Sequence, residues 1–226
     1  MDDRDALAAV WPLFGLSVRT PRVVLRYPTD SDLLALAALS GDIHAADYLP
    51  FQGTWSKLPD GERQQTVLQY HWGRRGGWST VAWRLELVVL VEDEVVGTQA
   101  VHGDDFAITR TVTTGSWLGR AHQGKGIGTE MRSASLHLAF AGLGADRAET
   151  DAYEDNSPSL GVTAKLGYQP NGDQIAVADG QRRRTVRFVL DRADWEATRR
   201  GDIEVSGVEA CRPLFGLGAA EGDAVT

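Results

Sequence analysis

The 226-residue chain is long enough for one sizeable hydrophobic core, and its 42% hydrophobic and 24% charged residues are typical of a globular protein. Its net charge of −8 argues against nucleic-acid binding, which needs a basic surface, and no apolar run approaches the roughly 18 to 20 residues of a membrane span. A single cysteine, Cys211, excludes an internal disulfide framework and a cysteine-based zinc site, and the acidic N-terminus argues against a secretory signal. We therefore expect a cytoplasmic protein without a metal.

The hydrophobic pattern predicts strands and amphipathic helices along most of the chain. Strand segments alternate or form short apolar runs, and helical segments repeat apolar residues every three or four positions. Asp30 or Ser31 caps the first expected helix, and Asn156 or Ser157 caps a later one that Gly167 closes. In chain order, we expect a strand over 18–27, a helix over 31–41, an irregular aromatic region over 42–80 with a helix at 62–75, strands over 83–91, 95–101 and 109–118, a helix over 129–145, a strand over 147–154, a helix over 156–167, a strand over 185–190 and a helix over 191–200.

This order of elements predicts a mixed α+β fold, in which helices cover the faces of a central sheet. Residues 1–200 are expected to form a single domain, and residues 201–226 a C-terminal extension that belongs to the same domain or forms an oligomer contact. The motif PLFGL occurs at both 12–16 and 213–217. Either both copies are convenient apolar turns, or both arms cover one edge of the domain or join subunits; we expect a homo-oligomer.

Four glycines and a lysine crowd the stretch GRAHQGKGIGTE at 119–130, which comes close to two phosphate-binding patterns. A P-loop needs Ser or Thr after its lysine, where Gly126 stands, and a Rossmann turn needs a third glycine where Thr129 stands. What remains is a loop that runs from a strand ending at Leu118 into a helix whose first amides have no helical partner. Such amides bind a pyrophosphate without a metal ion, and Lys125 is either an added charge or a solvated side chain.

Two motifs, in order and at the right spacing, resemble those of the GCN5-related N-acetyltransferases (GNAT). The sequence QGKGIG at 123–128 matches the [QR]xxGx[GA] signature, and NSPS at 156–159 followed by AKLGY at 164–168 is similar to a second motif of the RimJ/RimL branch. The resemblance covers about residues 11–217 and is closest to a mycobacterial succinyl-CoA-dependent member. It implies the GNAT fold: a mostly antiparallel twisted sheet with a V-shaped splay between two parallel strands, and helices on both faces.

The resemblance also implies that acetyl-CoA or succinyl-CoA inserts into this V. Backbone groups of Trp117 and Leu118 would hold the pantetheine arm and the acyl carbonyl, and Asn156 would contact the pantetheine. The pyrophosphate would lie on residues 123–129. The implied cofactor-binding residues are Trp117, Leu118, Gln123, Gly124, Lys125, Gly126, Ile127, Gly128, Thr129 and Asn156.

Ser159 is the candidate general acid by its match to the RimL branch, although a hydroxyl in a first helical turn is also a common capping feature. Since a hydroxyl does not titrate near pH 7, its role would be a hydrogen bond to the departing sulfur. The family's glutamate is matched here by Asn171, which cannot take a proton. Glu149 and Asp151, on one face of the preceding strand, are therefore the candidate bases, with His122 or water as alternatives.

These residues predict direct attack of a primary amine on the thioester of acyl-CoA. The acceptor is expected to be a small molecule, such as a metabolite or an antibiotic, or a protein N-terminus. A succinyl group would bring a carboxylate that needs a cation, for which Arg110 is a candidate. The alternative is a non-catalytic acyl-CoA-binding module, which would keep the glycine loop and lack an open cleft lined by residues 42–80.

Overall fold

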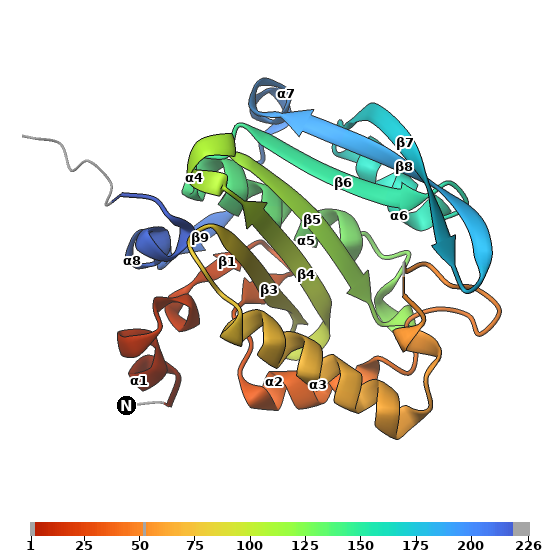
Figure 1. Cartoon of the computed structure of the whole chain (residues 1–226). Coiled ribbons are helices and arrows are strands. Elements are labelled where there is room, and N and C mark those ends of the chain that lie inside the picture. The colour runs from red at the N-terminus through yellow and green to blue at the C-terminus, as the bar shows by residue number, and fades with distance from the viewer. Residues whose placement is uncertain (1–2, 52, 219–226) are drawn as a thin grey trace, which may run out of the picture.

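The computed structural model describes residues 3–51 and 53–218, and within them nine strands form one sheet in the order β7-β8-β6-β5-β4-β3-β2-β1-β9 (Figure 1). Among these strands β5 and β6 are the parallel pair, and the other neighbours run antiparallel. The strands are β1 (Ser17–Arg19), β2 (Val24–Arg26), β3 (Ala82–Val91), β4 (Glu94–Asp104), β5 (Thr111–Leu118), β6 (Arg147–Tyr153), β7 (Gln169–Ala178), β8 (Gln181–Asp191) and β9 (Glu204–Ser206).

Helices cover both faces of the sheet, with α2 and α3 on one side and α5 on the other (Figure 1). The α-helices are α1 (Asp3–Val10), α2 (Asp30–Leu39), α3 (Asp60–Gly76), α4 (Phe106–Thr109), α5 (Ile127–His137), α6 (Ser157–Lys165), α7 (Arg192–Thr198) and α8 (Val208–Cys211). Short 3-10 turns are η1 (Pro12–Gly15), η2 (Trp55–Lys57), η3 (Arg120–His122) and η5 (Arg212–Phe215), and η4 (Leu138–Gly142) is a π-helical turn. The expected mixed fold, with a mostly antiparallel sheet and one parallel pair in the described residues, is confirmed.

The centre of the sheet is buried from both sides. Leu87 and Val89 point to the core that also contains Met131 of α5, whereas Val88 between them packs with Leu36 of α2. A strand buried on both faces has a continuous apolar sequence instead of an alternating one. This explains why β3 appears in the sequence as the run LELVVLV.

The N-cap of helix α2 lies one residue before the first of the two predicted positions. Thr29 is the N-cap, not Asp30 or Ser31: its hydroxyl accepts from the amide of Asp32, and the Asp32 carboxylate accepts from the Thr29 amide at 2.7 Å. This reciprocal pair is a capping box. Asp32 also forms a two-point ion pair with Arg26 of β2, so the cap fixes the helix to the sheet.

Two predicted elements differ from the structure, and one strand was not predicted. The single strand expected over 18–27 is wrong, because a turn between Thr20 and Val23 divides it into β1 and β2, which pair with each other. The helix expected over 129–145 starts at Ile127 and passes into the π-helical turn η4. Strand β7 was not predicted, since its side chains are mostly exposed and show no apolar alternation.

The C-terminal segment adds β9 to the sheet beside β1. Phe215, from the second PLFGL copy, is fully buried against Trp83 and Trp78, and the Trp78 indole donates to the Leu214 carbonyl at 2.8 Å. The first PLFGL copy forms η1, and α8, next to the second copy, packs against it. Both copies therefore lie at the same edge of the sheet.

Candidate active site

The parallel strands β5 and β6 separate along their length. Their ladder runs from Thr111 beside Arg147 to Thr113 beside Glu149 and then ends. A cavity of about 610 Å³ opens next to this parting, lined by the end of β5, the first turns of α5 and α6, and the loop at 43–51. An extended ligand can therefore enter between two strands whose backbone groups no longer pair with each other.

The glycine loop forms one wall of this cavity. Gly124 and Gly126 have φ angles of +70° and +82°, which residues with a side chain rarely adopt, and Gly126 is the N-cap of α5. The amide of Glu130 is the first to bond back into the helix, to the Gly126 carbonyl at 3.1 Å. The preceding amides, 127–129, have no acceptor inside the helix, and the helix dipole adds positive potential there. This wall fits a pyrophosphate.

The side chain of Gln123 holds the loop in place. Its amide nitrogen donates to the Leu118 carbonyl and to the Ile43 carbonyl, both at 2.8 Å. Gln123 thus connects the end of β5 to the loop at 43–51, which forms the opposite wall. Its side-chain amide thus bonds to the protein itself, and the backbone amides of the following loop residues remain available to a ligand.

Helix α6 provides the third wall. Its N-cap is Asn156, the first of the two residues predicted for this position. The side-chain oxygen of Asn156 accepts a hydrogen bond from the Ser159 amide at 3.2 Å. Gly167, with φ of +81°, follows the end of the helix. The cap directs the first turn toward the cavity, and Ser159 lies half-buried in its lining.

Most of the residues predicted to bind the cofactor lie together. Trp117, Leu118, Gln123, Gly124, Gly126, Gly128, Thr129 and Asn156 line the cavity. Lys125 is exposed beside the cavity without lining it, and Ile127 is buried in the core. The backbone amide of residue 127 still belongs to the open first turn, so only its side chain is remote from the ligand.

The predicted catalytic residues are not all brought together. Ser159 lines the cavity, whereas Glu149 and Asp151 do not, and Glu149 lies 3.5 Å from the Arg187 guanidinium. Asn171, on β7, and His122 also lie outside the lining. Arg110, the predicted cation for an acyl carboxylate, precedes the start of β5, at the opposite end of the strand from Leu118.

Arg120, Arg132 and Lys165 line the cavity, and of these Arg132 of α5 is the buried cation, which sequence reasoning missed. Its side chain is 4% exposed and donates to Thr150 of β6 at 3.2 Å and to Ser116 of β5 at 3.1 Å. No carboxylate of the described residues lies within ion-pair distance of it, and its Nε has no hydrogen-bond partner there. The arginine follows Met131 in an otherwise ordinary helical pattern, so nothing in the sequence marks it.

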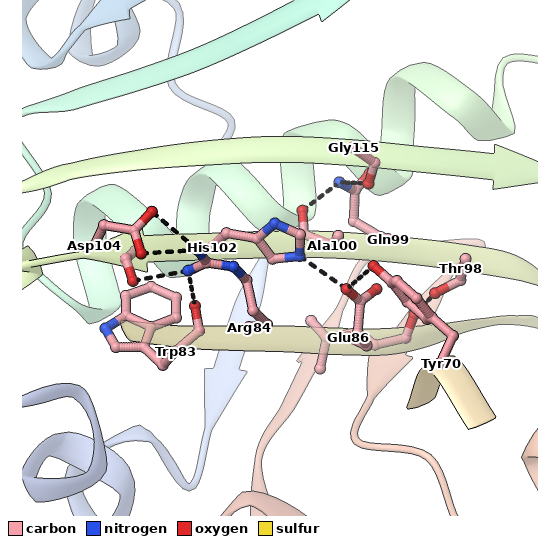
Figure 2. A network of polar contacts seen from close by, with 12 residues as sticks. Tyr70, Trp83, Arg84, Glu86, Thr98, Gln99, Ala100, His102, Asp104 and Gly115 are labelled. Carbon is pink, nitrogen blue, oxygen red and sulfur yellow. Dashed lines mark hydrogen bonds and ion pairs between the residues drawn. The ribbon is translucent and has the colours of Figure 1, made fainter. Parts of the chain in front are cut away.

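A second cavity, of about 320 Å³, lies on the other face of the sheet beneath α3. It shares Phe51, Ser116 and Trp117 with the first cavity, so the two spaces meet at the end of β5. Its floor carries Glu86 of β3 and His102 of β4, whose side chains contact each other at 2.8 Å (Figure 2). Sequence reasoning missed this pair too, although a glutamate inside the apolar run of β3 was a usable signal.

Neither a metal site nor a membrane-spanning helix is found in residues 3–51 and 53–218. There, no group of three His, Cys, Asp or Glu side chains is placed to hold a metal ion. None of the helices in those ranges is both long and apolar enough to cross a membrane.

Comparisons with known proteins agree with this geometry. The family described as acetyltransferase (GNAT) domain matches residues 22–169. The uncharacterized N-acetyltransferase p20 of Bacillus licheniformis is 32% identical over 89 residues, which is 39% of this chain and 49% of that protein. The probable N-acetyltransferase YjcK of Bacillus subtilis (strain 168) is 27% identical over 131 residues, which is 58% of this chain and 65% of that protein. The chain thus spans between about half and two thirds of the length of these relatives.

Among solved structures, Mycobacterium smegmatis RimJ in complex with CoA-disulfide is similar to this chain, with a TM-score of 0.63. The sequences are 20% identical, and the match covers 83% of this chain and 94% of RimJ. At this identity the likeness shows the fold, which is the GNAT fold.

Proposed function

The chain belongs to the GNAT acetyltransferase domain family, and from this membership and the site geometry we propose that it is an acyl-CoA-dependent N-acyltransferase. The observation that carries the proposal is the meeting of three features in one cavity. These are the parting of β5 and β6, the open amides at the start of α5, and the Ser159 hydroxyl on α6. The relatives' names support N-acyl transfer, and their activity is extended to this chain as part of the proposal.

The chain's own groups suit each part of acyl-CoA. Amides 127–129 and Gly124 receive the pyrophosphate, and backbone groups of Trp117 and Leu118, at the end of the separated strand, receive the pantetheine arm and acyl carbonyl. When bound, the thioester supplies an activated acyl carbon. Ser159 is placed on the wall of the same cavity, where its hydroxyl donates a hydrogen bond to the sulfur as the amine displaces it.

For the acyl group, we favour one that carries a free carboxylate, as in succinyl-CoA, over acetyl. Arg132 supports this choice because its guanidinium is buried in the cavity wall without a carboxylate partner among the described residues. A buried cation gains most from an anionic ligand that replaces its lost hydration. We therefore propose Arg132, in place of Arg110, as the cation that binds the acyl carboxylate.

The experiment that tests the function is a thermal-shift panel with coenzyme A, acetyl-CoA and succinyl-CoA, followed by a free-thiol assay across an amine library. A ligand that binds only the folded state raises the melting temperature, so acyl-CoA binding predicts a shift. Absence of any shift would refute the proposal. A shift without thiol release for any amine would instead support the non-catalytic binding module.

A further inference from the structure

The second cavity holds a buried carboxylate that no Lys or Arg of the described residues neutralises. Glu86 is 4% exposed and stands in the middle of β3. Its Oε1 accepts a hydrogen bond from the Tyr70 hydroxyl at 2.7 Å and contacts Nε2 of His102 at 2.8 Å (Figure 2). Both contacts go to the same oxygen, and the contacts of the described residues leave Oε2 without a hydrogen-bond partner.

The neighbouring groups keep this carboxylate ionised. Burial by itself would raise the pKa of Glu86, but the hydrogen bonds that its carboxylate accepts from His102 and Tyr70 hold the pKa below its ordinary value. Burial and the Glu86 charge raise the pKa of Tyr70, so its hydroxyl keeps its proton and donates it. The cavity floor therefore carries a negative charge in surroundings that hydrate it poorly.

An ionised Glu86 also determines how His102 is protonated. The carboxylate can only accept, so Nε2 of His102 carries the hydrogen of their 2.8 Å contact. In the neutral imidazole, Nδ1 then keeps its lone pair. No residue in the described ranges hydrogen-bonds to Nδ1, so it is available to accept a proton from a ligand.

A second polar group in the cavity wall lacks a partner. His71 of α3 is 3% exposed, and its Nδ1 is buried without a hydrogen bond to any described residue. Burial lowers the pKa of His71, and Arg75 and Arg74 add to this, so that the opposing effect of the Glu86 charge is outweighed and the ring is neutral. The polar groups of this cavity are thus not satisfied by the protein alone.

The other charged groups around the cavity are already engaged. Arg74 lies over the Tyr70 ring at 4.7 Å, Arg75 pairs with Asp30 at 2.7 Å, and Arg84 pairs with Asp104 at 2.7 Å. The rest of the lining is mainly apolar and aromatic, including Phe51, Trp55, Val67 and Trp117. The cavity therefore offers one negative charge at its floor and a hydrophobic wall.

We propose that this second cavity is the acceptor subsite, and that it takes a primary amine with one positive charge on an apolar or aromatic body. The inference rests on the proposed acyl transfer, because the cavity meets the acyl-CoA cavity at Ser116 and Trp117. A single buried carboxylate matches a single ammonium group. A polyamine would bring further charges that the apolar walls cannot solvate.

The proton path follows from the same contacts. The ammonium group gives one proton to Nδ1 of His102, and Glu86 stabilises the imidazolium through Nε2. The neutral nitrogen attacks the thioester carbon, so that a C–N bond forms and the C–S bond breaks. Its second proton passes to the departing sulfur through the Ser159 hydroxyl. The products are an amide and a free thiol, and His102 later releases its proton to water.

A binding titration tests the subsite without turnover. Trp55 and Trp117 line the cavity, so phenethylamine added to the full chain saturated with coenzyme A should change tryptophan fluorescence in a saturable way. Spermidine and a short peptide with a free N-terminus should bind at least about tenfold more weakly, and Glu86→Gln should weaken phenethylamine binding by about tenfold or more. No saturable binding of phenethylamine, or equal binding by Glu86→Gln, would overturn the inference.

Steady-state kinetics separate the roles of the two residues. Glu86→Gln should mainly raise KM for the amine, and His102→Gln should mainly lower kcat by about a hundredfold, while KM for the acyl-CoA stays within about twofold. Asp104→Asn is the matched control, since it removes a carboxylate of β4 outside the cavity and should leave both constants near wild type. Ala100→Leu fills the cavity beside Glu86 without touching a polar group and should abolish amine binding even if Glu86→Gln folds poorly.

The outcomes distinguish the two proposals. If coenzyme A and its acyl forms give no thermal shift, the proposed function fails. If they bind but phenethylamine does not, or if peptides are acylated and phenethylamine is not, the acceptor subsite is refuted and acyl transfer stands.

Discussion

The guanidinium of Arg132 and the hydroxyl of Ser116, 3.1 Å apart, connect α5 to β5 beyond the last ladder pair between β5 and β6. The same guanidinium donates to Thr150 of β6 at 3.2 Å. One buried cation therefore bridges the two separated strands and lines the cavity between them. Because its charge has no carboxylate partner in the described residues, an anionic group of a ligand gains from contact with it.

Arg132→Met should change acyl preference. It keeps the length of the side chain and removes the charge, so kcat/KM for succinyl-CoA should fall by about 10- to 100-fold, with a fall of only about threefold or less for acetyl-CoA. Arg132→Lys should recover part of the succinyl-CoA activity. The measurement is kcat/KM of each variant with succinyl-CoA and with acetyl-CoA. Equal losses for both donors would contradict a role of Arg132 in acyl recognition.

Gly126→Ala should weaken coenzyme A binding. The residue has φ of +82° at the start of α5, and an added Cβ would lie 3.3 Å from the Arg22 guanidinium. The strain should cost about 1 to 2 kcal/mol of unfolding free energy and raise the Kd for coenzyme A by about tenfold. Gly73→Ala within α3 is the control, since its Cβ meets nothing within 4 Å and alanine favours the helix. Calorimetric titration measures both, and an unchanged Kd in Gly126→Ala would count against the loop.

Ser159→Ala should lower kcat by about tenfold or more and leave KM for acyl-CoA within about twofold, because the hydroxyl acts on the departing sulfur and not on binding. The N-cap bond from the Ser159 amide to Asn156 remains, so the helix stays folded. Ser133→Ala on α5, outside both cavities, should have no effect on kcat. Retention of more than about half of kcat in Ser159→Ala would remove the assignment.

Asp32→Asn should lower the free energy of unfolding by about 2 kcal/mol at neutral pH, since the two-point pair with Arg26 and the capping box are both damaged. Although burial opposes it, hydrogen bonds from Arg26 and Thr29 hold the pKa of Asp32 below its ordinary value. A depressed folded pKa means that the stabilisation is present above the unfolded pKa of about 3.9 and is lost as the pH falls through the folded pKa.

Urea titrations at several pH values test the Asp32 prediction. The difference between wild type and Asp32→Asn should be full at pH 7 and should shrink below about pH 4. Asp30→Asn is the comparison, because its exposed pair with Arg75 should contribute about 1 kcal/mol or less. A difference that does not depend on pH would show that the ionised form of Asp32 is not what stabilises the fold.

Elements with strong local signals could be predicted from the sequence. Asn156 and Gly167 bound α6 through interactions within a few residues, and the glycines at 124 and 126 mark a backbone that other residues rarely adopt. By contrast, the turn that divides β1 from β2 interrupts a stretch that otherwise alternates, and only pairing of the two halves reveals it. Strand β7 forms because β8 lies beside it, not because its own residues are apolar.

The second cavity could not be found in the same way. Tyr70, Glu86 and His102 come from α3, β3 and β4, each sixteen residues from the next, and only sheet register and helix packing bring them together. The position of the two base candidates outside the cavity lining has the same cause. Glu149 and Asp151 do share a face of β6, as alternation requires, but which neighbours that face meets depends on tertiary packing.

The two hydrogen bonds of the Gln123 side chain have a thermodynamic consequence. They tie the loop that begins at Ile43 to the end of β5, and that loop carries Phe51, which lines both cavities. A ligand that orders this loop from one side therefore reduces the entropy left to be lost when the other ligand binds. Donor and acceptor should each tighten the other's binding by the same factor, so the chain is expected to bind its two substrates cooperatively.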